Sequence, residues 1–190
     1  MLCKKPYRNG VLEYGCGQCV PCRVNRSRLW QCRMLLESYE HPASCFVTLT
    51  FSDPHVPVML PAGEKDGLLQ YGSVEKRPWQ LFMKRLRKAL GGRKIRYFAV
   101  GEYGEKTWRP HYHGILFGVD PMEEEVIRKC WTFGFVSVGT AEGASMSYVA
   151  SYVLKGRISK REVKRRGLSP EWALMSRKPG LGSGIIWTGS

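Results

Sequence analysis

The segment 109–114 (RPHYHG) holds two histidines, His111 and His113, separated by one residue. Side chains of an extended strand alternate between its two faces, so both imidazoles would point to the same side and could bind one ion. Glu102 ends the preceding apolar stretch, and a hairpin would bring its carboxylate beside the two rings; Glu105, in the intervening loop, is the second choice. Two imidazoles with one carboxylate suit Mg²⁺ or Mn²⁺ acting on a phosphate group. The alternative is a half-exposed polar strand that binds no metal.

Two tyrosines, Tyr148 and Tyr152, stand four residues apart in the segment YVASYVLK, which ends at Lys155. On a helix this spacing places both rings on one face, about 6 Å apart along the axis, with Lys155 on the same side. A tyrosine hydroxyl can attack a phosphodiester to form a covalent phosphotyrosine, and a nearby cation can lower its pKa. Because Lys155 is closer to Tyr152, Tyr152 is favoured as the first nucleophile. A pair of core tyrosines on an amphipathic helix is the alternative.

A third cluster consists of Cys16, Cys19 and Cys22, with Cys3 upstream. Cysteine pairs separated by two residues are the usual ligands of tetrahedral Zn²⁺, and Cys3 would complete a structural site of four thiolates. An iron–sulfur cluster is a weaker interpretation of the same spacing. The chain has seven cysteines and no export signal, so thiols or a metal are expected in place of disulfides.

The chain is strongly basic, with 30 Lys and Arg against 16 Asp and Glu and a net charge of +14. The positive charge gathers in residues 4–33, 75–96 and 155–166, which favours a polyanionic partner, first of all nucleic acid. The candidate contacts are Arg77, Lys84, Arg87, Lys88, Arg109 and Arg157. No apolar run approaches the ~18 residues of a membrane span, so a soluble protein without a membrane partner is expected.

The positions of these residues depend on the elements that carry them. The pattern predicts helices over 23–40, 75–90, 121–131 and 144–155, and strands over 45–51, 95–102, 110–118 and 134–139. This order predicts an α+β fold in which an antiparallel sheet is flanked by helices, close to the ferredoxin-like arrangement. We expect a Cys-rich metal-binding segment with a basic helix over 1–40, a core over 41–160 and a basic C-terminal tail over 161–190.

Taken together, the motifs resemble those of HUH endonucleases, the rolling-circle replication initiators and relaxases. The strand TLTF (48–51), the His pair and the Tyr-x₃-Tyr-x₂-Lys segment occur in the order of the three family motifs. The two-tyrosine segment is most similar to that of replication initiators from small single-stranded DNA phages, the microviruses. The CGQCVPCR start (16–23) and the MSRKPG segment (175–180) resemble the gokushovirus branch of that group.

The resemblance implies a ferredoxin- or RRM-like HUH core and a site-specific endonuclease and ligase of single-stranded DNA. His111, His113 and Glu102 would hold the metal, Tyr148 and Tyr152 would be alternating nucleophiles, and Lys155 would assist them. The enzyme would nick the replication origin in the bacterial cytoplasm and depend on a host helicase and polymerase. Two alternatives stay open: a non-catalytic nucleic-acid-binding module with a zinc knuckle, and an HUH transposase or relaxase.

Overall fold

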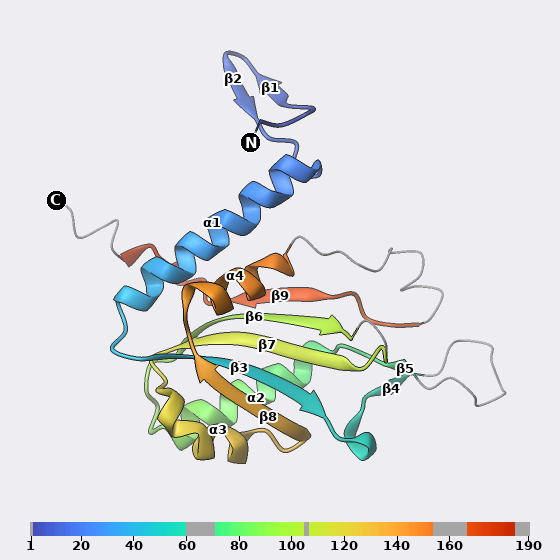
Figure 1. Cartoon of the computed structure of the whole chain (residues 1–190), viewed down its shortest axis with the longest axis vertical. Coiled ribbons are helices and arrows are strands. Elements are labelled where there is room, and N and C mark those ends of the chain that lie inside the picture. Colours follow the sequence, from blue (N-terminus) through green and yellow to red (C-terminus); the bar gives the residue numbers. More distant parts are fainter. Residues whose placement is uncertain (1, 60–70, 105–106, 154–166, 185–190) are drawn as a thin grey trace.

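The computed structural model describes residues 2–59, 71–104, 107–153 and 167–184. Five strands form the main sheet: β3 (Ser44–Phe51), β6 (Arg96–Tyr103), β7 (Pro110–Phe117), β8 (Gly134–Thr140) and β9 (Trp172–Met175). Their order is β8-β3-β7-β6-β9, and every neighbouring pair is antiparallel. Helices α1 (Val20–Tyr39) and α4 (Gly143–Ser151) cover one face, and α2 (Lys76–Ala89) and α3 (Glu124–Cys130) cover the other (Figure 1). The predicted α+β class is therefore confirmed.

Central strand β7 is buried on both faces, and its side chains alternate between two separate cores. Tyr112 and Leu116 face α2 and α3, whereas Ile115 and Phe117 face α1 and α4. Gly114 lies against α2, where an added Cβ would come within 2.5 Å of the Trp79 ring. Glycine at this position therefore allows Trp79 to pack directly on the backbone of the strand.

Strand β9 lies beyond the predicted end of the core at residue 160. It pairs with Phe98–Gly101 of β6, and Trp172 Nε1 donates a hydrogen bond to the Val74 carbonyl at 2.7 Å. The C-terminal region thus contributes an edge strand to the main sheet. A strand of four residues is too short to show a clear alternating pattern in the sequence.

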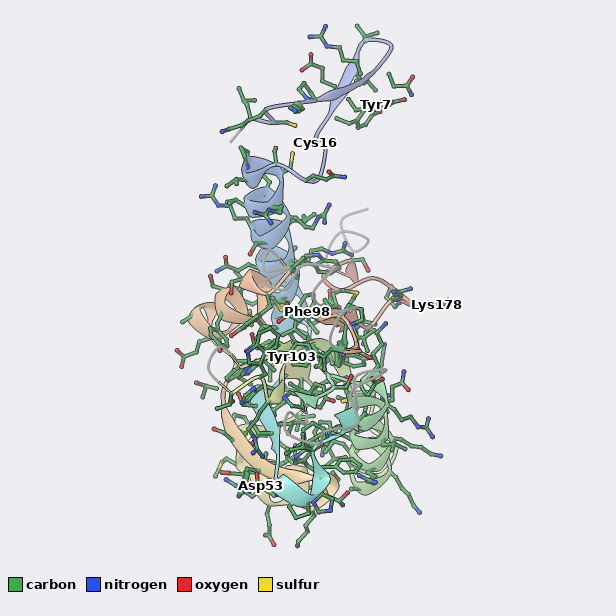
Figure 2. The ribbon with its side chains drawn as sticks, turned by 90° about the vertical axis from the view of Figure 1, so that its right-hand side faces the viewer. Tyr7, Cys16, Asp53, Phe98, Tyr103 and Lys178 are labelled. Atoms are coloured by element: carbon green, nitrogen blue, oxygen red, sulfur yellow. The ribbon has the colours of Figure 1, made fainter. Side chains whose placement is uncertain are left out.

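Smaller elements complete the described chain. The hairpin β1 (Tyr7–Asn9) and β2 (Leu12–Tyr14) lies in the segment expected to be a loop, at the end of α1 that projects away from the sheet (Figures 1 and 2). Strands β4 (Val58–Met59) and β5 (Tyr71–Gly72) form a second ribbon, and 3₁₀ turns occupy Asp53–His55 and Pro121–Glu123. Within the described ranges, no helix combines the length and apolarity needed to cross a bilayer.

Two predicted helices differ at their ends. The helix predicted over 121–131 begins as a 3₁₀ turn because Asp120 and Glu123 form a capping box around Pro121. Helix α4 ends at Ser151, earlier than the predicted residue 155, since the amides of Tyr152 and Val153 bond to carbonyls only three residues back. Lys155 lies outside the described residues.

A buried carboxylate, Glu37, joins α1 to the sheet and to the C-terminal region. Its oxygens accept hydrogen bonds from the Arg96 guanidinium and, at 2.7 Å, from the Gly182 amide, and His41 Nε2 lies 3.1 Å away. Burial by itself raises the pKa of Glu37, but the bonds from Arg96, Gly182 and His41 together hold it below its ordinary value. The ionised form of Glu37 therefore stabilises the fold.

We expect Glu37→Gln to lower the free energy of unfolding by about 3 kcal/mol at neutral pH, because it leaves the buried Arg96 charge unpaired. A depressed carboxyl pKa stabilises above the unfolded value of about 4.3, and this contribution disappears as the pH falls through the folded pKa. Urea unfolding at pH 7 and between pH 5 and about pH 3 tests both effects. The control is Glu124→Gln, which removes an exposed ion pair with Arg128 and should cost about 0.5 kcal/mol or less. An equal, pH-independent effect of both substitutions would contradict the assignment.

Candidate active site

The antiparallel pairing of β6 with β7 brings the two predicted metal-binding segments together. Glu102 lies opposite His111 in the register, and its Oε1 is 3.0 Å from Nε2 of His113. The loop between the strands is closed by a bond from the Gly104 amide to the Arg109 carbonyl. Glu102 and His113 are both almost fully buried. The predicted hairpin thus places the carboxylate beside the His pair, while Glu105 lies outside the described residues.

Thr48 of β3 holds the other side of the same imidazole. It lies opposite His113 in the register, and its Oγ1 is 3.0 Å from Nδ1 of the ring. Both ring nitrogens of His113 therefore have hydrogen-bond partners, which fixes the orientation of the imidazole. The sequence marked Thr48 only as part of a strand motif, because its contact with His113 spans 65 residues.

Both tyrosines of the predicted pair lie over His113. The ring of Tyr152 is stacked on the imidazole, with centroids 5.5 Å apart, and the ring of Tyr148 meets it edge-on at 5.3 Å. The Tyr152 hydroxyl donates to the Tyr148 hydroxyl at 2.5 Å. Tyr148 is also 44% exposed to solvent, whereas Tyr152 is partly buried. Helix α4 thus presents two adjacent hydroxyls, one of them accessible, beside the His pair.

The electrostatic environment distinguishes the acidic from the basic groups. Burial, the hydrogen bond to Tyr148 and the proximity of Glu102 all raise the pKa of Tyr152. Burial and the neighbouring His113 lower the pKa of His111, so its imidazole is neutral at neutral pH. A neutral imidazole can bind a metal, but the Tyr152 phenol stays protonated unless a cation offsets the Glu102 charge.

The donor set fits a divalent cation in its chemistry. Two imidazoles and one carboxylate project from the same face, and Nδ1 of His111 is buried with no hydrogen-bond partner in the described chain. The His111 and His113 ring centroids are 6.4 Å apart. In the part of the chain that the structure describes, ligand atoms of three or more such residues come within 4.8 Å only at the four cysteines. An ion held by all three predicted ligands would therefore draw His111 toward the Glu102–His113 pair.

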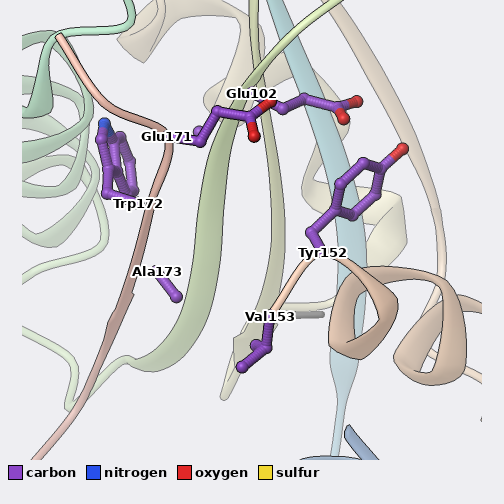
Figure 3. Close-up of a pocket in the computed structure, with 7 residues that line it drawn as sticks. Glu102, Tyr152, Val153, Glu171, Trp172 and Ala173 are labelled. Carbon is purple, nitrogen blue, oxygen red and sulfur yellow. The ribbon is translucent and has the colours of Figure 1, made fainter. Parts of the chain in front are cut away.

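A pocket of about 190 Å³ opens beside this centre (Figure 3). Glu102 and Tyr152 form one side, and Glu171 and Trp172 form the other, with the Tyr152 hydroxyl turned toward the Glu102 carboxylate. Glu171 also accepts a hydrogen bond from the Tyr103 amide at 3.3 Å. Sequence reasoning missed Glu171 and Trp172, because only the pairing of β9 with β6 brings them here. The pocket places a second carboxylate next to the predicted metal ligands.

The predicted DNA contacts do not gather at this centre. Arg77, Lys84, Arg87 and Lys88 belong to α2, on the opposite face of the sheet. Arg87 lies over the Tyr97 ring and bonds to the Ile95 carbonyl, so it also has a structural role. Arg109 pairs with Asp53 and bonds to the Phe51 carbonyl at 2.7 Å. Arg157 lies outside the described residues.

The four cysteines predicted as a structural metal site do come together. Cys3, Cys16, Cys19 and Cys22 place their sulfurs within 4.8 Å of one another at the junction of the hairpin with α1. The remaining cysteines are separate from this group: Cys32 is exposed on α1, and Cys45 and Cys130 are buried in the core.

Comparison with known proteins follows the same motifs. The family model of the replication-associated protein ORF2 matches residues 44–157. Replication-associated protein VP4 of Bdellovibrio phage phiMH2K is 32% identical over 164 residues, covering 75% of this chain and 48% of its own. Replication-associated protein ORF2 of Spiroplasma virus 4 is 33% identical over 185 residues, covering 87% and 55%. The chain thus spans about half the length of these relatives. No solved structure shows a significant match.

Proposed function

Because the chain belongs to the family of the replication-associated protein ORF2, we propose that it nicks single-stranded DNA through a phosphotyrosine to initiate rolling-circle replication. The observation that supports this most is the packing of both tyrosines on His113, whose other contacts are Glu102 and Thr48. A nucleophile and a metal-ligand set are the two parts that such a transesterification needs. A purely structural pair of tyrosines would not require an exposed hydroxyl at that position.

The proposed reaction exchanges one phosphodiester for another. A tyrosine oxygen attacks the scissile phosphorus and loses its proton, the bond from phosphorus to the 3′ oxygen breaks, and the leaving 3′ oxygen takes up a proton. The 5′ phosphate stays on the tyrosine, and the free 3′ hydroxyl can prime synthesis. A divalent ion bound by His111, His113 and Glu102 would polarise the phosphate and offset the charge that develops on it. The residues of the chain orient the nucleophile and the ligands.

The hydrogen bond between the tyrosines favours Tyr148 as the first nucleophile, rather than Tyr152 as Lys155 suggested. Tyr152 donates its proton to the Tyr148 oxygen, and a donated hydrogen bond stabilises a phenolate on the acceptor. Tyr148 is also the more exposed of the two, so a DNA phosphate can reach it. Once Tyr148 carries the 5′ phosphate, Tyr152 is the remaining hydroxyl for the second transfer, which releases the copied strand as a circle. The single-stranded origin, the host helicase and the host polymerase are the partners that we propose.

We expect Tyr148→Phe and Tyr152→Phe to keep some single-turnover nicking but to lose efficient circle release, and the double variant to form no adduct. Incubation of each variant with labelled single-stranded origin DNA and Mn²⁺, followed by a denaturing gel, measures the adduct. Mass spectrometry of the DNA-linked peptide identifies the tyrosine, with Tyr148 expected in the first nick. Tyr39→Phe, at an exposed tyrosine of α1, is the control and should behave like the wild type. Cleavage with an adduct on neither tyrosine would refute the mechanism, and DNA binding without cleavage would favour the non-catalytic module.

We expect His113→Ala to abolish adduct formation while sparing most DNA binding, and EDTA to do the same to the wild type. Thr48→Val should reduce adduct formation about tenfold, because it frees one nitrogen of the His113 ring, and a higher Mn²⁺ concentration should restore it. Titration of Mn²⁺ against adduct yield measures both effects. Normal cleavage by His113→Ala in EDTA would exclude the metal assignment.

The position of α2 gives a separate prediction for binding. Because Lys84 and Lys88 are exposed on the face opposite the tyrosines, Lys84→Ala/Lys88→Ala should weaken DNA binding without changing the adduct yield at saturating DNA. The slope of log affinity against log salt should fall by about 0.7 for each phosphate that the protein no longer neutralises. Fluorescence anisotropy between about 50 and 200 mM salt measures the slope. An unchanged slope would place the DNA away from α2, and His113→Ala provides the reciprocal control.

A further inference from the structure

The N-terminal lobe, residues 2–19, has no hydrophobic core of its own. None of these residues is buried, and both three-residue strands of its hairpin are exposed along their whole length. An isolated two-stranded ribbon is marginally stable at best in water, and segments this small usually need a metal, a disulfide or a partner. An interaction other than apolar packing must therefore hold the lobe on α1.

The four sulfurs at the base of the lobe have the spacing of a tetrahedral metal site. They all lie within 4.8 Å of one another, and the sulfurs of Cys3 and Cys19 are 3.8 Å apart. A disulfide would require about 2.05 Å. Tetrahedral Zn²⁺ with Zn–S bonds of about 2.3 Å separates its sulfurs by about 3.8 Å. The geometry is that of ligands around an ion.

The backbone around the sulfurs is arranged to stabilise thiolates. The amides of Lys5 and Cys16 both donate to Cys3 Sγ at 3.3 Å, and the Cys19 amide donates to Cys16 Sγ at 3.4 Å. Gly17, between these cysteines, has a φ of +73°, which a side chain would disfavour. An added Cβ at Gly15 would lie 2.9 Å from Cys22 Sγ. The chain therefore folds closely around the four sulfurs.

We propose that Cys3, Cys16, Cys19 and Cys22 bind one structural Zn²⁺ that fastens the lobe to the first turn of α1. Each thiol gives up its proton to solvent on binding, so four thiolates and the ion leave two negative charges. Lys4, Lys5 and Arg26 lie in the same region to offset them, and Arg26 also bonds to the Gly17 carbonyl at 3.4 Å. Four protein ligands close the coordination sphere, so the ion supports the lobe and takes no part in the chemistry of the tyrosines. This proposal is independent of the proposed nicking activity.

The test measures metal content and the protection of the lobe in the full chain. Protein purified under reducing conditions should contain about one Zn per chain by elemental analysis. Replacement by Co²⁺ should give the thiolate-to-metal absorption and the ligand-field bands of a tetrahedral four-sulfur site. In hydrogen exchange, removal of zinc with a chelator should expose the amides of residues 2–22, while the amides of β3, β6 and β7 stay protected.

Matched serine substitutions decide which thiols bind the ion. Cys16→Ser and Cys19→Ser should each lose most of the zinc and the cobalt spectrum, whereas Cys32→Ser, at an exposed cysteine of the same helix, should keep both. A chain that stays metal-free after incubation with Zn²⁺ and shows no cobalt bands would overturn the proposal. Iron in place of zinc, or zinc retained in Cys16→Ser and Cys19→Ser, would overturn it equally. Because these readouts do not use DNA cleavage, failure of the nicking mechanism would leave them unchanged.

Discussion

Strand β7 must satisfy two hydrophobic faces at once, and the rest of the structure follows from this constraint. Its odd-numbered residues place His111 and His113 under α4, while Tyr112 and Leu116 fill the core under α2. Tyr112 is fully buried, and its hydroxyl donates to the Glu75 carbonyl at 2.7 Å. The residue between the two histidines therefore belongs to the opposite core and can be aromatic without touching the site. Because a one-residue slip would exchange the two faces, the register is strongly specified.

Packing of α4 on β7 puts the reactive groups in mutual contact. The same contacts that orient Tyr152, namely the stacking on His113 and the proximity of Glu102, also raise its pKa. A site of this kind is quiescent until a cation offsets the carboxylate, since burial and negative charge both favour the protonated phenol. Tyr148, at the exposed edge, is held by the same cluster without being enclosed by it.

Local periodicity accounts for what the sequence could predict, and long-range pairing accounts for what it could not. The His pair, the preceding carboxylate and the tyrosine spacing depend on repeats of two and of about four residues, which the sequence displays directly. Thr48 and Glu171 reach the site through strand pairings that no local pattern encodes. The basic residues of α2 were predicted from charge alone, and charge does not indicate which face of a sheet a helix covers. The 3₁₀ end of α4 follows from its last hydrogen bonds, which composition does not reveal.

The carboxylate of Glu37 also restricts the order in which the chain can fold during synthesis. Glu37 is made 59 residues before Arg96 and 145 residues before Gly182, both of which it needs as partners. Until then its charge has to remain in water, since burial without partners would cost several kcal/mol. Helix α1 therefore docks on the sheet late, after β6 and the segment around Gly182 have left the ribosome. The first long helix to be synthesised is in this way among the last to be locked in place.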